Sequence, residues 1–171
     1  MATYTLISSV TVGSGGAATI NFSSIPATYT DLVLKWSGRS TSNADPSTAP
    51  WDTAYLTINS GTSPTNKYVV GTGSAVASGS DNYVYAGGAA GSNSTASTFG
   101  NTEIYLPNYT SANNKSISID GVTENNATAS VAWLIAGLIT SSTAINSITL
   151  TLFNGNFVQY STAYLYGISN A

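Results

Sequence analysis

The stretch Ser116-Ile117-Ser118-Ile119-Asp120-Gly121 alternates polar and apolar side chains. Successive side chains of a β-strand point to opposite faces of a sheet, so this alternation predicts a strand with one buried face and one solvated face. The dipeptide Asp120-Gly121 favours a turn, and we expect the strand to end there. Sheets with one buried and one solvated face are usually antiparallel, so the stretch predicts an antiparallel sheet in the middle of the chain.

The same period of two recurs on both sides of this stretch, and turn residues separate the segments. It predicts strands at residues 4–12, 18–22, 31–36, 55–59, 67–70, 103–106, 145–152 and 164–168. We expect residues 67–70 to pair with 55–59. No segment shows a sustained helical stripe. The pattern predicts an all-β fold, a single antiparallel β-sandwich over residues 1–171 that is jelly-roll-like and has about ten short strands.

Three segments depart from simple alternation. Residues 130–139 are apolar almost throughout, which predicts a strand covered on both faces, with a bulge at Gly137; a short helix is the alternative. Residues 39–50 have the Ser, Asn, Asp and Pro content of a loop. Residues 71–100 are rich in Gly, Ala and Ser, and we expect a flexible loop or an arm that becomes ordered only against a partner.

The side-chain inventory excludes most enzyme classes. The chain contains neither His nor Cys, so it can form no Ser-His or Cys-His nucleophile pair and no ordinary zinc or thiol site. We expect no enzyme activity and no cofactor. Seven carboxylates leave glycoside hydrolysis open, with Asp45 and Asp52, or Asp120 and Glu124 around a turn, as the candidate pairs. Their role as turn residues is the preferred interpretation. A calcium site in the loops is the weaker alternative, since the spacing Asp-x-Asp-x-Asp-Gly is absent.

Charge limits the partners. Only 6% of the residues are charged, and four cations against seven anions give a net charge of −3. Such a chain cannot neutralise a run of phosphates, so we expect neither nucleic acid nor an anionic membrane as partner. The first residues show no basic region before an apolar stretch. We therefore expect no signal peptide and synthesis in a cytoplasm.

Aromatic residues are the best candidates for binding, because each buries a large rigid area at little entropic cost. Those that border expected loops are preferred over Trp36 and Trp133, which lie inside apolar runs. The only arginine is added because it follows an expected strand; it can pair with Asp31, Asp45 or Asp52 and hold its own loop, or reach a neighbouring subunit. The candidate contact residues are Trp51, Tyr83, Tyr85, Tyr105, Tyr109 and Arg39.

Several longer motifs resemble one group of proteins. They are residues 22–32 (FSSIPATYTDL), the following Ser37-Gly38-Arg39-Ser40, residues 104–109 (IYLPNY), residues 115–118 (KSIS), and residues 156–157 (NF) with 161–168 (STAYLYGI). Together they are similar to small virion proteins of tailed bacteriophages that infect cyanobacteria and marine bacteria. The likeness covers most of the chain and is weakest at residues 71–100. It implies a virion component, on head or tail, and brings no catalytic residues.

The resemblance and the composition lead to one expected function and two alternatives. We expect a capsid decoration, or cement, protein on the head surface of the virion, a homo-oligomer in the form of a trimer that clamps subunits of the major capsid protein. The alternative is a tail-fibre or receptor-binding module that recognises cell-surface polysaccharide through loop aromatics. A polysaccharide depolymerase is the third candidate, because a carboxylate pair is all that its chemistry requires.

Overall fold

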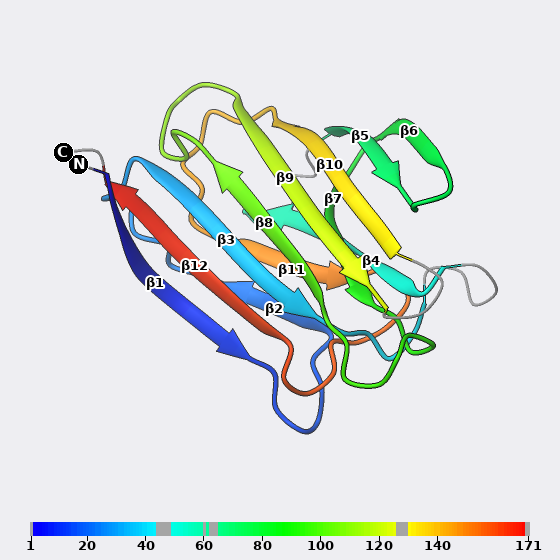
Figure 1. Ribbon diagram of the computed structural model, residues 1–171. Helices are drawn as coiled ribbons and strands as arrows, with labels where there is room; N and C mark the ends of the chain where they lie inside the picture. The colour runs from blue at the N-terminus through cyan, green and yellow to red at the C-terminus, as the bar shows by residue number, and fades with distance from the viewer. Residues whose placement is uncertain (1, 44–48, 60, 62–64, 126–129, 170–171) are drawn as a thin grey trace.

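The computed structural model describes residues 2–43, 49–59, 61, 65–125 and 130–169, which form twelve β-strands and no helix (Figure 1). The strands are β1 (Thr3–Thr11), β2 (Thr19–Phe22), β3 (Asp31–Gly38), β4 (Trp51–Ile58), β5 (Thr65–Gly71), β6 (Val76–Asp81), β7 (Val84–Ala90), β8 (Gly100–Leu106), β9 (Lys115–Glu124), β10 (Ser130–Ile139), β11 (Ile148–Leu152) and β12 (Thr162–Ser169). No helix long and apolar enough to cross a bilayer occurs in these described ranges.

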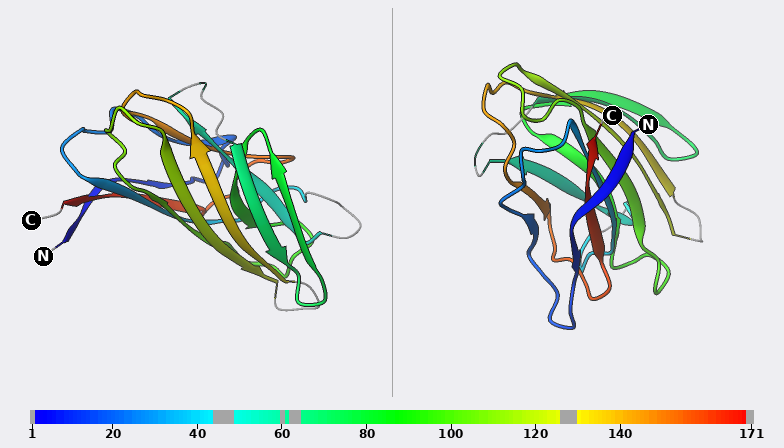
Figure 2. Two further views of the ribbon diagram at one scale, coloured as in Figure 1. Left: turned by 90° about the horizontal axis from the view of Figure 1, so that it is seen from above. Right: turned by 90° about the vertical axis from the view of Figure 1, so that its left-hand side faces the viewer.

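The strands form two sheets of unequal width. The larger sheet has the order β1-β12-β3-β8-β9-β10-β5-β6 and the smaller one the order β2-β11-β4-β7. Every pairing in both sheets is antiparallel. Figures 1 and 2 show the sheets as two facing layers, with the β5–β6 hairpin at one end of the wider layer. The expected all-β sandwich is confirmed, with twelve described strands in place of about ten.

Two hairpins widen the larger sheet beyond an eight-stranded framework. Without β5–β6 and β9–β10, four strands remain in each sheet, in the orders β1-β12-β3-β8 and β2-β11-β4-β7. Jelly rolls are double sheets of eight strands, and this framework is compatible with the expected jelly-roll-like arrangement. The last described strand, β12, lies between β1 and β3, and its residue Ser169 pairs with Thr3.

The core lies between the inner faces of the two sheets. Alternate residues of most strands enter it, among them Leu34 and Trp36 of β3 and Leu56 of β4, all nearly inaccessible to solvent. The indole nitrogen Nε1 of Trp36 donates a hydrogen bond to the carbonyl oxygen of Ala86 at 2.9 Å, and this bond joins the larger sheet to β7 of the smaller one. The polar atom of the largest core side chain is thereby satisfied.

Residues 71–100 correct the expectation of a loop or arm, because β6 and β7 lie within them and only 91–99 form a long connection. Strand β7 is almost completely buried and packs against β8 and β9. Small residues fit this close approach: a Cβ atom on Gly87 would lie 2.2 Å from Oγ1 of Thr102. The Gly and Ala content that resembles a flexible segment is instead a packing requirement.

Three local expectations are also wrong. Asp120-Gly121 lies inside β9, not at a turn, because β8 and β10 pair with both residues from either side. The register of β10 is continuous through Gly137, so no bulge occurs there; a Cβ atom at Gly137 would lie 3.0 Å from Val84. Residues 67–70 belong to β5, which pairs with β10 and β6 in the larger sheet and not with 55–59.

Substitution of Gly87 tests the packing of β7. Gly87 lies at a register shift between β4 and β7 and has a φ of +87°, a conformation that side chains with a Cβ rarely adopt. We expect Gly87→Ala to lower the free energy of unfolding by about 2–4 kcal/mol, since strain and overlap with Thr102 add. The control is Gly13→Ala, with nothing within 4 Å of the added Cβ. Chemical denaturation measures both, and equal stabilities would contradict the assignment.

Candidate functional site

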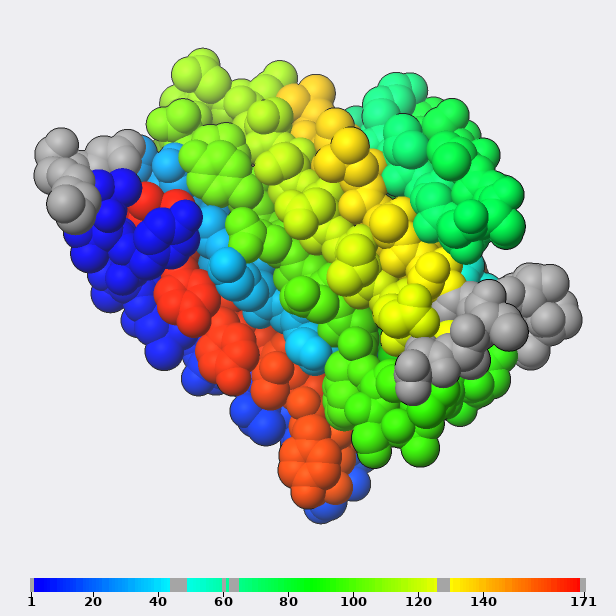
Figure 3. Space-filling model, in the orientation of Figure 1, coloured from blue at the N-terminus to red at the C-terminus, as the bar shows by residue number. Residues whose placement is uncertain are grey.

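The outer face of β10 is apolar and open. Burial alternates along the strand, so Val131, Trp133 and Ile135 enter the core while Leu134 and Leu138 are exposed. The expected strand is confirmed and the helical alternative is wrong. The expectation that both faces are covered is also wrong for the described chain, because the smaller sheet covers only the inner face. Figure 3 looks onto the outer face of the larger sheet, with β10 in yellow.

Five exposed aliphatic residues gather around this face. Their side chains are 40–76% exposed, and we call them the aliphatic patch: Val69, Val76, Val122, Leu134 and Leu138. The pairing registers make four of them neighbours. Leu134 of β10 lies opposite Val69 of β5. Two residues away on β10, Ala132 lies between Val122 of β9 and Gly71 of β5. Gly71 in turn lies opposite Val76 of β6. The patch therefore spans β9, β10, β5 and β6 on one side of the sheet.

The patch carries no charge of its own, and charges lie at its border. Asp120 and Lys67 occupy the neighbouring positions of β9 and β5 on the same face. Further across the sheet, Nζ of Lys35 lies 2.6 Å from Oε2 of Glu103, which is the ion pair seen within the described ranges. The hydrogen bond and charge of Glu103 raise the pKa of Lys35. Both side chains are about half exposed, so the pair adds little to stability.

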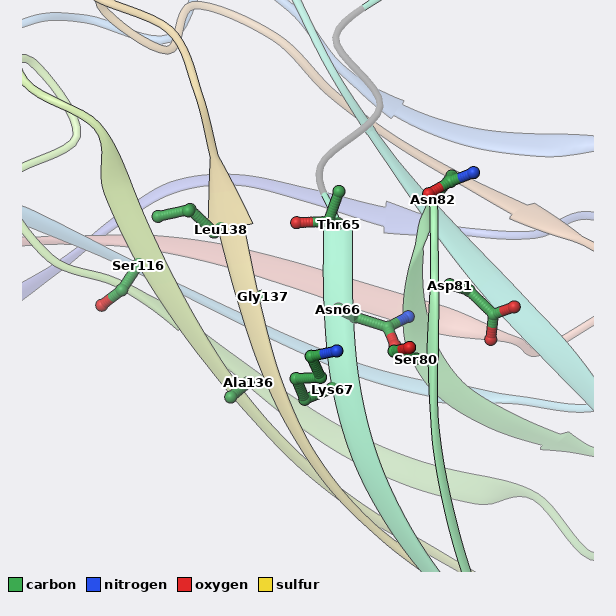
Figure 4. A pocket seen from close by; sticks show the side chains of 10 residues that line it. All are labelled: Thr65, Asn66, Lys67, Ser80, Asp81, Asn82, Ser116, Ala136, Gly137 and Leu138. Atoms are coloured by element: carbon green, nitrogen blue, oxygen red, sulfur yellow. The ribbon is translucent and has the colours of Figure 1, made fainter.

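A hollow of about 500 Å³ lies beside the patch at the end of β5, β6 and β10 (Figure 4). Its polar side chains do not converge. Asn66 and Asp81 are cross-strand partners on one side of the β5–β6 hairpin, whereas Lys67 and Ser80 are partners on the other side. Since a ligand in the hollow would not meet both sets, we assign no binding site to it.

A second surface feature is a cluster of aromatic side chains beside β7. We call its six members the aromatic cluster: Tyr55, Tyr68, Tyr83, Tyr85, Trp133 and Phe153. Tyr55 is central, with ring centroids 4.9 Å from Tyr83, 5.9 Å from Tyr85 and 5.4 Å from Phe153. Tyr85 continues the cluster inward to Tyr68 and Trp133. The cluster therefore runs without a break from the core to the surface.

The hydroxyl groups of the cluster lie close to a carboxylate. The hydroxyl oxygens of Tyr83 and Tyr85 are 3.5 Å apart. Burial raises the pKa of Tyr85, and hydrogen bonds to Tyr83 and Asp81 raise it further. Burial also raises the pKa of Tyr55, with the nearby Tyr83 as the next cause. Tyr55 and Tyr85 therefore stay neutral and offer hydroxyl groups near Asp81.

The candidate contact residues fall into different places. Tyr83 and Tyr85 belong to the aromatic cluster, and Trp51 is partly buried against the core near β7. Tyr105 lies on the larger sheet, where its hydroxyl donates to Oδ2 of Asp31 at 3.0 Å. Tyr109 is completely buried, and its hydroxyl donates to the carbonyl of Pro26. Tyr109 is therefore a core residue and not a contact residue.

Arg39 holds a loop, though not by the route that the sequence suggests. Its guanidinium donates to the carbonyl oxygens of Ser92, Ser94, Thr95 and Thr98, and also to the hydroxyl of Thr98, at 2.9–3.4 Å. These contacts fix the connection between β7 and β8. No ion pair of Arg39 with Asp31 or Asp52 occurs in the described chain, and the third expected partner, Asp45, lies outside the described residues. Because most of its donors are occupied within the chain, Arg39 has little left for a partner.

Neither candidate pair of carboxylates from the sequence forms a glycosidase pair in the described chain, although Glu103 and Asp120 are cross-strand partners of β8 and β9. Asp52 is fully buried and Asp45 lies outside the described residues. Asp120 and Glu124 are four residues apart on β9, which places their Cα atoms about 13 Å apart. Glycoside hydrolysis uses carboxyl groups that are about 5–10 Å apart. Within the described ranges no three acidic residues come close enough to hold a metal ion.

The sequence predicted only some of the residues of the aliphatic patch and the aromatic cluster. Tyr55, Tyr68 and Phe153 were not among its candidates, because Tyr55 and Tyr68 lie inside expected strands and alternation does not show which faces stay open. The aliphatic patch had a signal: the lack of alternation in 130–139 marks a strand with two apolar faces.

Comparison with protein-family models, with curated proteins and with solved structures found no match for this chain.

The buried Asp52 makes stability depend on pH. Burial raises its pKa, although Ser40, which donates to Oδ2 at 2.7 Å, and the amide of Asn154, at 3.2 Å from Oδ1, lower it in part. A raised pKa means that the folded chain holds the proton more tightly than the unfolded chain. The stability from this group is complete below about pH 4 and is lost as the pH rises through the raised pKa.

We therefore expect Asp52→Asn to remove this dependence, because the amide keeps the shape of the side chain without the buried charge. Thermal unfolding at stepped pH values from about 3 to 7 measures the effect. The wild type should lose stability relative to the variant as the pH rises. Asp120→Asn, which removes an exposed carboxyl of β9, is the control for net charge. Parallel profiles for wild type and Asp52→Asn would contradict the argument.

Proposed function

We propose that this chain is a virion structural protein, a capsid decoration protein that binds the head of a tailed bacteriophage without making or breaking a covalent bond. The observation that carries the proposal is the aliphatic patch on the outer face of the larger sheet. A strand that is apolar on both faces is normally covered on both faces. In β10 the described chain covers one face only, so the second cover comes from another subunit.

The chemistry of this face supports a permanent contact. Most side chains around the patch are small and neutral, among them Ala132, Ala136, Ser116 and Ser118, while Asp120 and Lys67 are the charged residues at its border. The apolar part of this face packs against another protein with little cost for removing charges from water. Large exposed apolar patches on soluble proteins mark sites of interaction. A chain with only 6% charged residues therefore suits a place inside an assembly.

In the proposed role the chain forms a homo-oligomer, a trimer, and clamps neighbouring subunits of the major capsid protein. The stabilisation follows from mass action: a protein that binds only the assembled shell shifts the equilibrium away from its opening. Many copies on one head add their contributions, so modest individual contacts suffice. This role requires no cofactor, no metal and no catalytic residue.

A tail-fibre or receptor-binding module that recognises polysaccharide is the second candidate, and the exposed rings of Tyr83 and Phe153 favour it. The two candidates differ in copy number. Quantitative mass spectrometry of purified virions from the phage that encodes the chain counts copies relative to the major capsid protein. A decoration protein is present in numbers comparable to the capsid subunits. A handful of copies would overturn the decoration role and support a place on the tail.

Substitution within the aliphatic patch tests the contact itself. We expect Leu134→Ser combined with Val69→Ser to abolish the oligomer and the incorporation into heads, because both remove apolar area from the proposed interface. Since both side chains are exposed, the melting temperature of the free subunit should change by only a few degrees. Mass photometry and head-binding sedimentation measure the effect.

Leu6→Ser is the matched control for this test. Leu6 is an exposed leucine on β1, at the opposite edge of the same sheet. Its substitution should leave the oligomer and head binding intact. An equal loss in control and patch variants would show that the patch is not the interface.

A further inference from the structure

The exposed fraction of the side chains in the aromatic cluster rises from its inner end to its outer end. Trp133, at its inner end, is 8% exposed, whereas Tyr83 and Phe153, at its outer end, are 37% and 59% exposed. Tyr55 contacts both outer rings at centroid distances of 4.9 and 5.4 Å with nearly perpendicular planes. The outer rings are therefore held in place by the rings packed against them, so a ligand would not have to immobilise them on binding.

The polar groups around the rings are nearly all uncharged. Tyr55 lies opposite Thr151 of β11, and the next pair along is Thr57 with Thr149. The hydroxyls of Tyr83 and Tyr85 add donors and acceptors. Two carboxylates act on these rings: Asp81, which helps to raise the pKa of Tyr85, and Asp52, which is fully buried and out of reach of a ligand. Aromatic faces, hydroxyl groups and a single acid therefore meet at this surface.

The four cations of the chain are placed elsewhere. Lys67 lies on the opposite side of the hairpin from Asp81, and Lys35 pairs with Glu103 on the larger sheet. Arg39 is occupied by the loop carbonyls, and Lys115 is buried. An anionic ligand such as a phosphate or a uronic acid would thus meet a carboxylate and no cation. The ligand that fits is uncharged.

We propose that the aromatic cluster is a binding site for an uncharged glycan. A pyranose ring has C–H faces, which pack on the flat rings of Tyr83 and Phe153, and a rim of hydroxyl groups, which donate to Asp81 and exchange hydrogen bonds with the tyrosine and threonine hydroxyls. The same division into apolar faces and a polar rim makes tyrosine a common contact residue in recognition surfaces. The site involves no bond cleavage. It is independent of the proposed contact through the aliphatic patch, which lies on the outer face of the larger sheet.

Isothermal titration of the full chain tests the site. The probes are the neutral hexasaccharides of cellulose, starch, laminarin and α-mannan, with hexagalacturonate as the charged comparator. We expect at least one neutral probe to bind with a Kd of roughly 1 mM or tighter. Hexagalacturonate should not bind. Failure of all four neutral probes at about 10 mM, a concentration ten times that limit, overturns the proposal, and so does tighter binding of hexagalacturonate.

Matched variants separate the cluster from other exposed rings. We expect Tyr83→Ala and Phe153→Ala each to weaken the binding of the neutral probe at least tenfold. The controls are Tyr164→Ala and Tyr4→Ala, because these residues have the same exposures of 37% and 59% and lie on the larger sheet. They should leave Kd unchanged. Equal effects of cluster and control variants overturn the proposal.

Asp81→Asn keeps the shape of the side chain and leaves all the aromatic rings in place. It therefore tests the site even if an aromatic-to-alanine variant fails to fold. It should weaken binding of the neutral probe several-fold, while circular dichroism shows an unchanged fold. Unchanged binding in both Asp81→Asn and Phe153→Ala would leave no role for the cluster and would overturn the proposal. Neither result bears on head binding, so failure of the glycan site and failure of the decoration role are distinguishable.

Discussion

The structure depends on the packing of a wide sheet against a narrow one. Eight strands cannot be covered on their inner face by four, so the part of the larger sheet formed by β10 and β5 extends past the edge strand β7. Burial of apolar area drives the closure of such an edge. Tyr68 and Trp133 of the larger sheet fill it together with Tyr85 of β7. The inner rings of the aromatic cluster therefore close this edge of the sandwich, and its outer rings remain exposed to solvent.

Strands in which apolar and polar residues alternate were predictable from the sequence, and strands built of small, closely packed residues were not. The period of two located β9 and β11 because one face of each is buried and the other is more open. It missed β6 and β7, whose small residues follow from close packing against Thr102 and neighbouring strands. Local chemistry misled at Asp120-Gly121, where pairing with strands on both sides overrides the preference of the dipeptide for a turn.

The candidate surfaces show the same limit. The sequence singled out Tyr83 and Tyr85, which the structure brings together with Tyr55 and Phe153. It also singled out Tyr109, a buried side chain, because a residue that borders a loop can point either way. A strand with two apolar faces was recognised at 130–139, but the sequence alone does not say that the described part of the chain covers only one of them. Both surfaces depend on the order of the strands in the sheets, which no short pattern contains.

The position of β12 between β1 and β3 sets when the molecule can form. A chain is made from its N-terminus, so β1 leaves the ribosome long before its only neighbour in the sheet exists. Until then the backbone of β1 has no strand to pair with, and β3 lacks the β12 neighbour that places Leu165 beside Leu34. Folding of the larger sheet is therefore a late event of synthesis, and pairings between distant segments make it slow. During that interval, protection from other nascent chains has to come from outside the chain.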